Sequence, residues 1–127
     1  MIALDASVLI AHLSPFDSHH TAATAILLDA TPGSTLVHTL TMAEVLVGGV
    51  RIGRGAAMRD DLRAAGVDVA PHDVDEPLRL AELRASTGLT LPDCCALDVA
   101  IHHRADLATF DAALALAGRR RGLTVLP

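Results

Sequence analysis

The sequence predicts a single α/β domain over residues 1–127, with a central, mostly parallel five-stranded sheet flanked by helices in three layers. Three observations support this fold class. The length of 127 residues matches one compact domain. Short apolar runs alternate with helical stretches along the whole chain, as in strands joined by helical crossovers. Hydrophobic residues make up 51% of the chain and charged residues 20%, which argues against a disordered protein.

The first half of the chain predicts two strands separated by a helical pair. Met1–Asp5 is an apolar run that ends in an acid, as expected of a buried strand. Ala6–Leu13 continues as a short helix, which Ser14-Pro15 stops. The next elements are a helix over His19–Ala30 capped by Asp17 or Ser18, a turn over Thr31–Ser34, a strand over Thr35–His38, and a helix that Thr41 caps and that ends near Gly48-Gly49.

The second half continues the alternation and supplies three more strands. Gly66 stops a helix over Arg51–Ala65, and Gly88 ends a helix that Asp75 caps and that runs to Thr87. Pro92 suits the first position of a helix that reaches about His103. The remaining elements are strands over Val67–Ala70, Asp106–Thr109 and Gly122–Leu126, with a helix over Ala112–Arg121 before the last strand.

The composition excludes several classes of protein. All ten basic residues are arginines, so a P-loop and Schiff-base chemistry are ruled out for want of a lysine. The formal net charge of −5 and the presence of only two aromatic residues disfavour a general nucleic-acid-binding module. Adjacent Cys94 and Cys95 are typical of small core residues in a reducing compartment. Since no signal peptide or apolar run of membrane-spanning length is present, we expect a cytoplasmic protein without membrane association.

Four acids stand directly after a predicted strand or at the start of a predicted helix. Asp5 and Asp111 follow strands, and Glu44 and Asp93 lie in first helical turns. Because sites in parallel sheets gather at the carboxyl ends of the strands, we expect these acids to converge. Without a lysine to neutralise them, carboxylates in such a group favour Mg²⁺ or Mn²⁺. The sequence therefore predicts a metal centre formed by Asp5, Glu44, Asp93 and Asp111.

A plainer interpretation applies to some of these acids, because the helix dipole alone favours an acid in a first turn. The helix-dipole interpretation does not account for Asp5, because Asp5 lies inside an apolar segment where a carboxylate needs a partner or a role. Asp98 ranks below the four because it lies ~140° around the helix from Asp93. The run Arg119–Arg121 either complements a helix dipole or contacts RNA, and the paired histidines suit a surface role better than a metal site.

The order of these motifs resembles that of PIN-domain nucleases along essentially the whole chain. The motifs that carry the resemblance are Ile2-Ala-Leu-Asp5-Ala-Ser7, Thr41-Met-Ala-Glu44-Val, Leu91-Pro-Asp93-Cys and Leu107-Ala-Thr109-Phe-Asp111. In its short single-domain form, the chain resembles the VapC-like toxins of bacterial toxin–antitoxin pairs. The sequence departs from the family pattern at Cys94-Cys95, which we expect to pack, and at Phe110, which we expect to be available to stack on a base.

The resemblance implies a Mg²⁺- or Mn²⁺-dependent endoribonuclease that forms a homodimer and is held inactive by a cognate antitoxin. It implies that Asp5, Glu44, Asp93 and Asp111 are the catalytic and metal-binding acids, and that Ser7 and Thr109 are polar supports near the metal or the phosphate. Arg51 and Arg54, which follow Glu44, are further candidates for binding the RNA. We expect the apolar helices between Ala22 and Leu62 to carry the protein interfaces.

Two other classes of protein are compatible with parts of this pattern. A catalytically silent PIN-like module would retain the acids and act through protein–protein interaction alone. A small flavodoxin-like ligand-binding domain would share the fold, although Asp5 would repel a phosphate group at the first strand. Nuclease activity that Asp5→Asn removes would separate the enzyme from both alternatives.

Overall fold

A single parallel sheet organises the chain in the computed structural model, which describes all 127 residues. Its strands are β1 (Ile2–Leu4), β2 (Thr35–Val37), β3 (Val67–Val69), β4 (Asp106–Ala108) and β5 (Val125–Leu126). They lie in the order β3-β2-β1-β4-β5, and every neighbouring pair is parallel. After β1, the chain adds β2 and β3 on one side of that strand, and then β4 and β5 on its other side. In such sheets, ligands bind beyond the carboxyl ends of the strands at the point of reversal.

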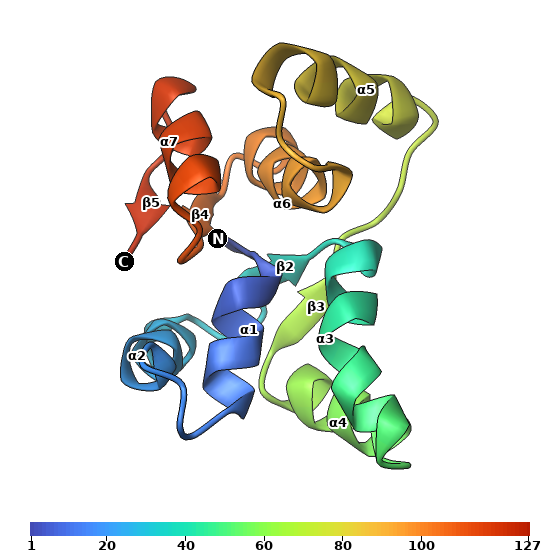
Figure 1. Cartoon of the computed structure of the whole chain (residues 1–127), viewed down its shortest axis with the longest axis vertical. Coiled ribbons are helices and arrows are strands. Elements are labelled where there is room, and N and C mark those ends of the chain that lie inside the picture. The colour runs from blue at the N-terminus through green and yellow to red at the C-terminus, as the bar shows by residue number, and fades with distance from the viewer.

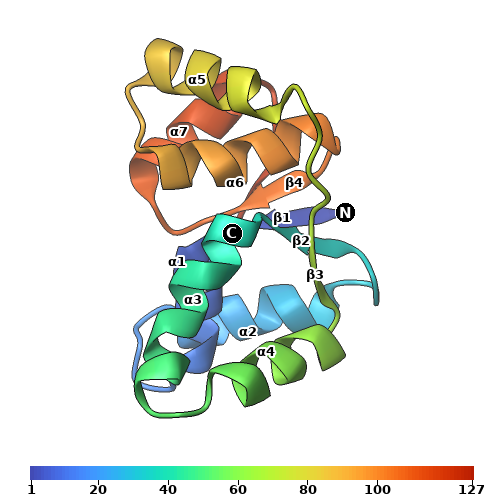
Figure 2. The same cartoon turned by 90° about the vertical axis from the view of Figure 1, so that its right-hand side faces the viewer.

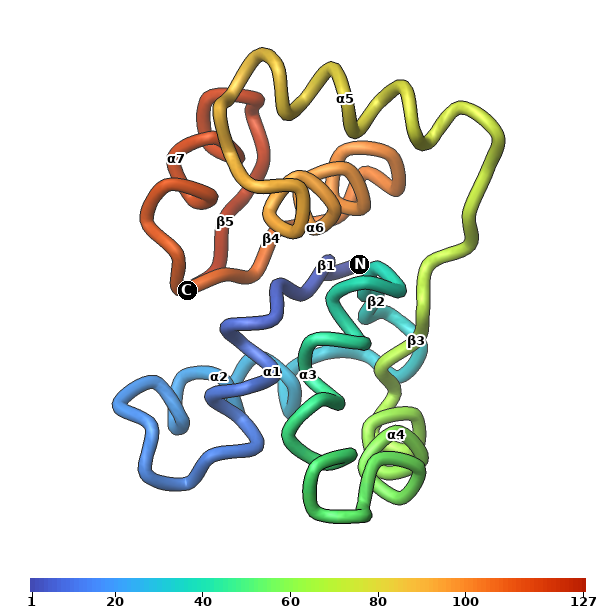
Figure 3. The backbone as a smooth tube through the Cα atoms, turned by 45° about the vertical axis from the view of Figure 1, so that its right-hand side comes forward, coloured from blue at the N-terminus to red at the C-terminus, as the bar shows by residue number.

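Helices cover both faces of this sheet, and the three predicted layers are confirmed (Figures 1 and 2). On one face are α1 (Ala6–Leu13), α2 (His20–Asp29), α3 (Thr39–Arg51) and α4 (Gly55–Ala64). On the other are α5 (Glu76–Thr87), α6 (Leu91–His102) and α7 (Ala112–Arg120). The long connection from β3 to α5 carries the chain from the first face to the second (Figure 3).

The core is divided by the sheet into two clusters, because successive strand residues point to opposite faces. In β1, Ala3 packs with α6 and α7 while Leu4 packs with α1 to α4. In β4, Leu107 and Ala108 divide in the same way. Aliphatic side chains fill both clusters, as the near absence of aromatic residues requires. Cys94 and Cys95 are buried free thiols within α6, as their apolar context predicts.

Two helices differ from the sequence prediction in their bounds. Helix α3 begins at Thr39 rather than after Thr41, because the ring of His38 accepts a hydrogen bond from Leu40 N at 3.0 Å and caps the helix earlier. Glu44, predicted in the first turn of this helix, therefore lies in its second turn. The helix also continues through Gly48 and Gly49 to Arg51, where the prediction ended it. Helix α4 begins only at Gly55, since the preceding residues form a turn in which Gly53 has a φ of 73°. The other elements agree with the prediction to within a few residues, and no helix has the length and apolar character needed to cross a membrane.

Candidate metal centre

Asp5 stands at the carboxyl end of β1, beside the point where the strand order reverses. Its side chain is buried, and two hydroxyls hold one of its oxygens: Ser7 Oγ donates to Oδ2 at 2.8 Å and Thr109 Oγ1 at 2.9 Å. No donor of the chain reaches the other oxygen, Oδ1. The carboxylate is therefore oriented by its neighbours and still has one oxygen free for a ligand.

Asp111 joins the site from the neighbouring strand β4. Its backbone N–H donates to Thr109 Oγ1 at 3.0 Å, so one hydroxyl connects Asp111 to Asp5. The Oδ1 atom of Asp111 accepts a hydrogen bond from Leu114 N at 2.8 Å, which caps α7. The cap fixes the direction of the carboxylate and leaves Oδ2 without a partner in the chain.

Glu44 and Asp93 approach the same place from two helices, one on each face of the sheet. Burial raises the pKa of Glu44, and the negative charges of Asp5 and Asp93 raise it further. Burial likewise raises the pKa of Asp93; the Thr90 hydroxyl opposes this, while the charges of Asp5 and Asp111 add to it. Asp5 and Asp93 thus act electrostatically on Glu44, and Asp5 and Asp111 on Asp93, although no three of the four acids bring their carboxylate oxygens within 4.8 Å of one another.

No cation of the chain neutralises this group of carboxylates. The arginine–carboxylate ion pairs of the structure use other acids, namely Asp60, Asp73 and Asp98. Burial is the main cause of the raised pKa values of Glu44 and Asp93, and the negative charges of neighbouring acids add to it. An all-oxygen donor set of this kind suits Mg²⁺ or Mn²⁺ better than Zn²⁺.

The candidate substrate residues occupy different positions relative to these acids. Ser7 and Thr109 lie within the site and both donate to Asp5. Arg51 and Glu44 line one pocket of about 380 Å³ between α1, α3 and α4. Arg54 does not line that pocket and stands immediately before α4. The structure thus brings Arg51, but not Arg54, into a shared hollow with one of the acids.

Two features that the sequence left open lie outside the site. Asp98 is buried and forms a two-pronged ion pair with Arg79, whose Nε and Nη2 donate to its two oxygens at 2.9 and 3.1 Å. The run Arg119–Arg121 lies at the end of α7. Because α7 starts at the carboxyl edge beside Asp111 and runs back along the sheet, this basic run is at the opposite edge from the acids.

A cluster of two histidines and a glutamate was missed by the sequence analysis. His38 Nε2 and Glu76 Oε1 are 2.6 Å apart, and His72 Nδ1 bonds the other oxygen of Glu76. The three side chains come from the end of β2, the β3–α5 connection and the start of α5, so only the fold brings them together. Burial alone would raise the pKa of Glu76. The hydrogen bonds from His72 and His38 outweigh burial, so the pKa of Glu76 lies below its usual value.

The spacing of this cluster would admit a metal ion, but its hydrogen bonds occupy the ligand atoms. His38 Nδ1 accepts the N–H of Leu40, so the proton of the neutral ring must be on Nε2, where it is donated to Glu76. His72 Nε2 is likewise engaged by Thr39 Oγ1 at 2.9 Å. We therefore interpret the cluster as a hydrogen-bonded clasp between β2, α3 and α5, in which His38 and Glu76 are buried and His72 is exposed.

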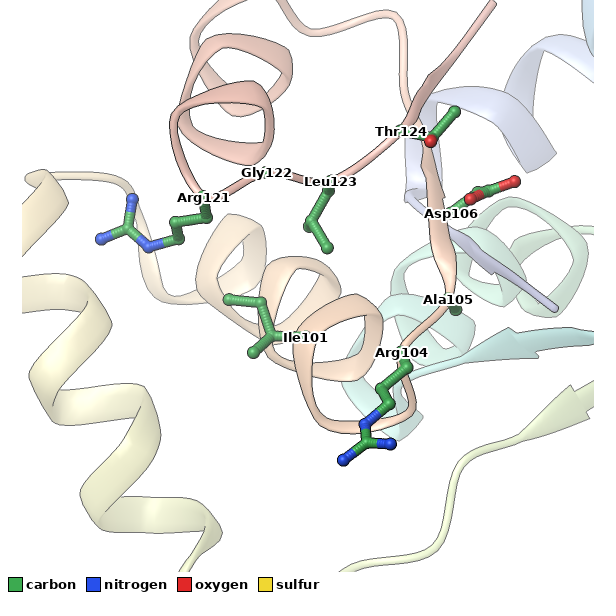
Figure 4. Close-up of a pocket in the computed structure, with 8 residues that line it drawn as sticks. All are labelled: Ile101, Arg104, Ala105, Asp106, Arg121, Gly122, Leu123 and Thr124. Carbon is green, nitrogen blue, oxygen red and sulfur yellow. The ribbon is translucent and has the colours of Figure 1, made fainter.

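The largest pocket of the structure, about 640 Å³, lies away from the acids. In its lining, Asp106 begins β4 and Thr124 directly precedes β5. The pocket therefore lies at the amino ends of these strands. Figure 4 shows Ile101 and Leu123 within it, while Arg104 and Arg121 extend their guanidinium groups to different sides. Pocket size therefore does not identify the candidate metal centre, which is an open group of carboxylates at the other edge of the sheet.

Comparison with known proteins agrees with the fold. The family model of the PIN domain matches residues 2–119, and the chain therefore belongs to the PIN domain family. A search of curated proteins found no match. All the solved structures described next are below 25% identity to this chain, so their similarity is evidence of a shared fold.

Two of the similar structures are named as a toxin–antitoxin complex and as a toxin. A toxin–antitoxin complex from Klebsiella pneumoniae is 24% identical, with a TM-score of 0.70 over 87% of this chain and 85% of that one. The sarcin-ricin loop cleaving toxin VapC20 from Mycobacterium tuberculosis is 18% identical, with a TM-score of 0.75 over 93% and 95%. FitAcB from Neisseria gonorrhoeae is also 18% identical, with a TM-score of 0.69 over 100% and 97%. The resemblance to VapC-like toxins inferred from the motifs is confirmed at the level of the fold.

Proposed function

We propose that this chain is a metal-dependent endoribonuclease and the toxin of a toxin–antitoxin pair. The observation that carries the proposal is the electrostatic influence that Asp5, Glu44, Asp93 and Asp111 have on one another without a single cationic partner. Membership of the PIN family and structural similarity to a ribosomal-RNA-cleaving toxin support the same function. The four carboxylates would hold Mg²⁺ or Mn²⁺.

The bound cation would activate a water molecule and stabilise the negative charge that develops on the phosphate. Asp5 would direct its free Oδ1 to the ion, because Ser7 and Thr109 hold Oδ2. Asp93 would share the ion from α6. Asp111 and Glu44 would hold the attacking water in line with the leaving 3′ oxygen. Arg51 would contact a neighbouring phosphate along the pocket that it shares with Glu44.

Analysis of the ends of cleaved RNA tests the proposed chemistry. Attack by an external water leaves a 5′ phosphate and a 3′ hydroxyl, whereas attack by the RNA 2′ hydroxyl leaves a 2′,3′-cyclic phosphate. We expect the former products, no cleavage in excess EDTA, and loss of cleavage in Asp5→Asn. A cyclic phosphate, or full activity in EDTA, would contradict the metal mechanism. RNA that stays intact under all conditions would favour the catalytically silent PIN-like module.

The proposed partners are an antitoxin and a second copy of the chain. The similarity to a toxin–antitoxin complex supports an antitoxin partner. Apolar side chains at the end of α3 and just beyond it are exposed: Val47 is 43% exposed, Val50 65% and Ile52 69%. Exposed apolar patches mark protein interfaces, and this patch adjoins the pocket that reaches Glu44. We therefore assign this patch to contact with the second copy of the chain.

A further inference from the structure

Phe110 is fixed beside the acids by its place in the chain. It lies between Thr109 and Asp111, and its backbone N–H donates to Ser7 Oγ at 3.0 Å. Its ring is half-buried and packs against the core that α1 to α4 share with the sheet. The sequence analysis expected this ring to be open to a base. The structure instead covers it with another ring.

The covering ring is that of His19, at the end of the α1–α2 loop. The two ring centres are 4.2 Å apart and the planes are inclined by only 11°, so the rings are stacked. Because Phe110 is half-buried against the core and His19 is exposed, His19 presents the outward face of the pair.

The loop holds His19 in this position. The backbone N–H of His19 donates to Asp17 Oδ1 at 2.8 Å, and the ring of the next residue, His20, bonds the carbonyl oxygen of Ala11 at 3.0 Å. The imidazole of His19 itself forms no hydrogen bond or ion pair within the chain. Its ring is thus immobilised through the backbone and the stack, while its polar atoms and outer face are unused.

We propose that the His19–Phe110 stack is a platform for an unpaired nucleobase next to the phosphodiester held at the acids. This inference rests on the proposed nuclease function and specifies its substrate as RNA with an unpaired base at the cleavage site. Unpaired bases are recognised by stacking on aromatic rings, including histidine, and a base within a helix is not accessible in that way. Since Phe110 directly precedes Asp111, a base on His19 belongs to a nucleotide at or beside the cleaved bond.

Binding without cleavage tests the platform separately from the nuclease. The probe is a short single-stranded RNA containing 2-aminopurine, whose fluorescence falls when the base stacks. In the Asp93→Asn background, which removes the proposed activity, we expect quenching on binding and about tenfold weaker affinity after His19→Ala. His19→Phe should restore both. Phe16→Ala is the matched control, because Phe16 is in the same loop, is fully exposed and has no ring partner.

Kinetics with otherwise unaltered protein complete the test. His19→Ala should raise KM about tenfold for single-stranded RNA while kcat stays within about twofold. Absence of quenching in the Asp93→Asn protein, or an unchanged affinity and KM after His19→Ala, would overturn the platform. A loss of kcat at unchanged KM would also overturn it and assign His19 to the chemistry. Quenching that depends on His19, without any cleavage by the unaltered chain, would refute the nuclease and leave the platform in place.

Discussion

Asp5 illustrates how a charge is kept at the end of an apolar strand. Two hydroxyls, from Ser7 and Thr109, satisfy one carboxylate oxygen, and each hydroxyl in turn accepts a backbone N–H from the segment that carries Asp111. Such a network compensates a buried carboxylate for part of its lost hydration. It also couples the geometry of the two strand ends, so a change at either hydroxyl would move both acids.

At the scale of single residues, we predict that Asp93→Asn separates activity from stability. Burial and the charges of Asp5 and Asp111 raise the pKa of Asp93, so its ionised form opposes folding. At a pH at which Asp93 is ionised, the amide should raise the Tm of the metal-free protein by a few degrees. Ribonuclease activity should fall about 100-fold or more. Thermal unfolding in EDTA and in Mg²⁺ measures the effect; a lower Tm in EDTA would contradict the repulsion.

A second residue-scale prediction concerns the clasp around Glu76. At pH 7, Glu76→Gln should lower the free energy of unfolding by about 1–3 kcal/mol, because an amide cannot accept both histidine N–H groups. The folded pKa of Glu76 is below its usual value of 4.5, so its contribution is complete above 4.5 and is lost as the pH falls through the folded pKa. Urea unfolding of both proteins at several pH values should show their difference narrowing in acid. A difference that is constant with pH would show that the charge of Glu76 is not responsible.

At the scale of elements, two helical glycines separate the effect of intrinsic helix propensity on stability from the effect of tertiary packing. Gly48 in α3 has no atom within 4 Å of the place a Cβ would take, and Gly118 in α7 would place one 2.9 Å from Leu107 Cδ2 and 3.2 Å from Val125 Cγ2. Gly48→Ala should therefore stabilise the protein by up to about 1 kcal/mol through helix propensity. Gly118→Ala gains the same term but crowds the buried Leu107, so we expect a net loss of about 1 kcal/mol. Urea unfolding measures the change in the free energy of unfolding of each variant. Equal changes for Gly48→Ala and Gly118→Ala would contradict the prediction.

At the scale of the whole molecule, the exposed patch at the end of α3 predicts self-association. Val50→Asp places a charge in the middle of the patch, so it should shift a dimer towards monomer in sedimentation experiments at micromolar concentration. Val74→Asp is a control of equal chemistry, since Val74 is 91% exposed and lies in the connection between β3 and α5. A monomer in the unaltered protein, or equal effects of both changes, would rule out this patch as the dimer interface.

The sequence by itself determined the order of strands and helices and the positions of Asp5, Asp93 and Asp111 after strands or at helix starts. These features depend on local patterns: apolar runs, capping residues, and glycines such as Gly88, which ends α5 with a φ of 70°. The strand order within the sheet, β3-β2-β1-β4-β5, was not predicted from the sequence. Local signals were less reliable where side chains compete, as at α3, which His38 rather than Thr41 caps.

Only the tertiary structure decided which distant side chains meet. Arg79 neutralises Asp98 and so removes it from the acidic site, His72 and His38 converge on Glu76, and His19 covers Phe110. Each of these pairings joins residues on different elements, with no fixed spacing in the chain to announce them. Contacts of this kind depend on how helices pack on the sheet, whereas strand ends and helix starts are determined by neighbours in the sequence. The places of Asp5, Asp93 and Asp111 were predictable because they stand at such ends, whereas Glu44 lies one turn further into α3 than predicted.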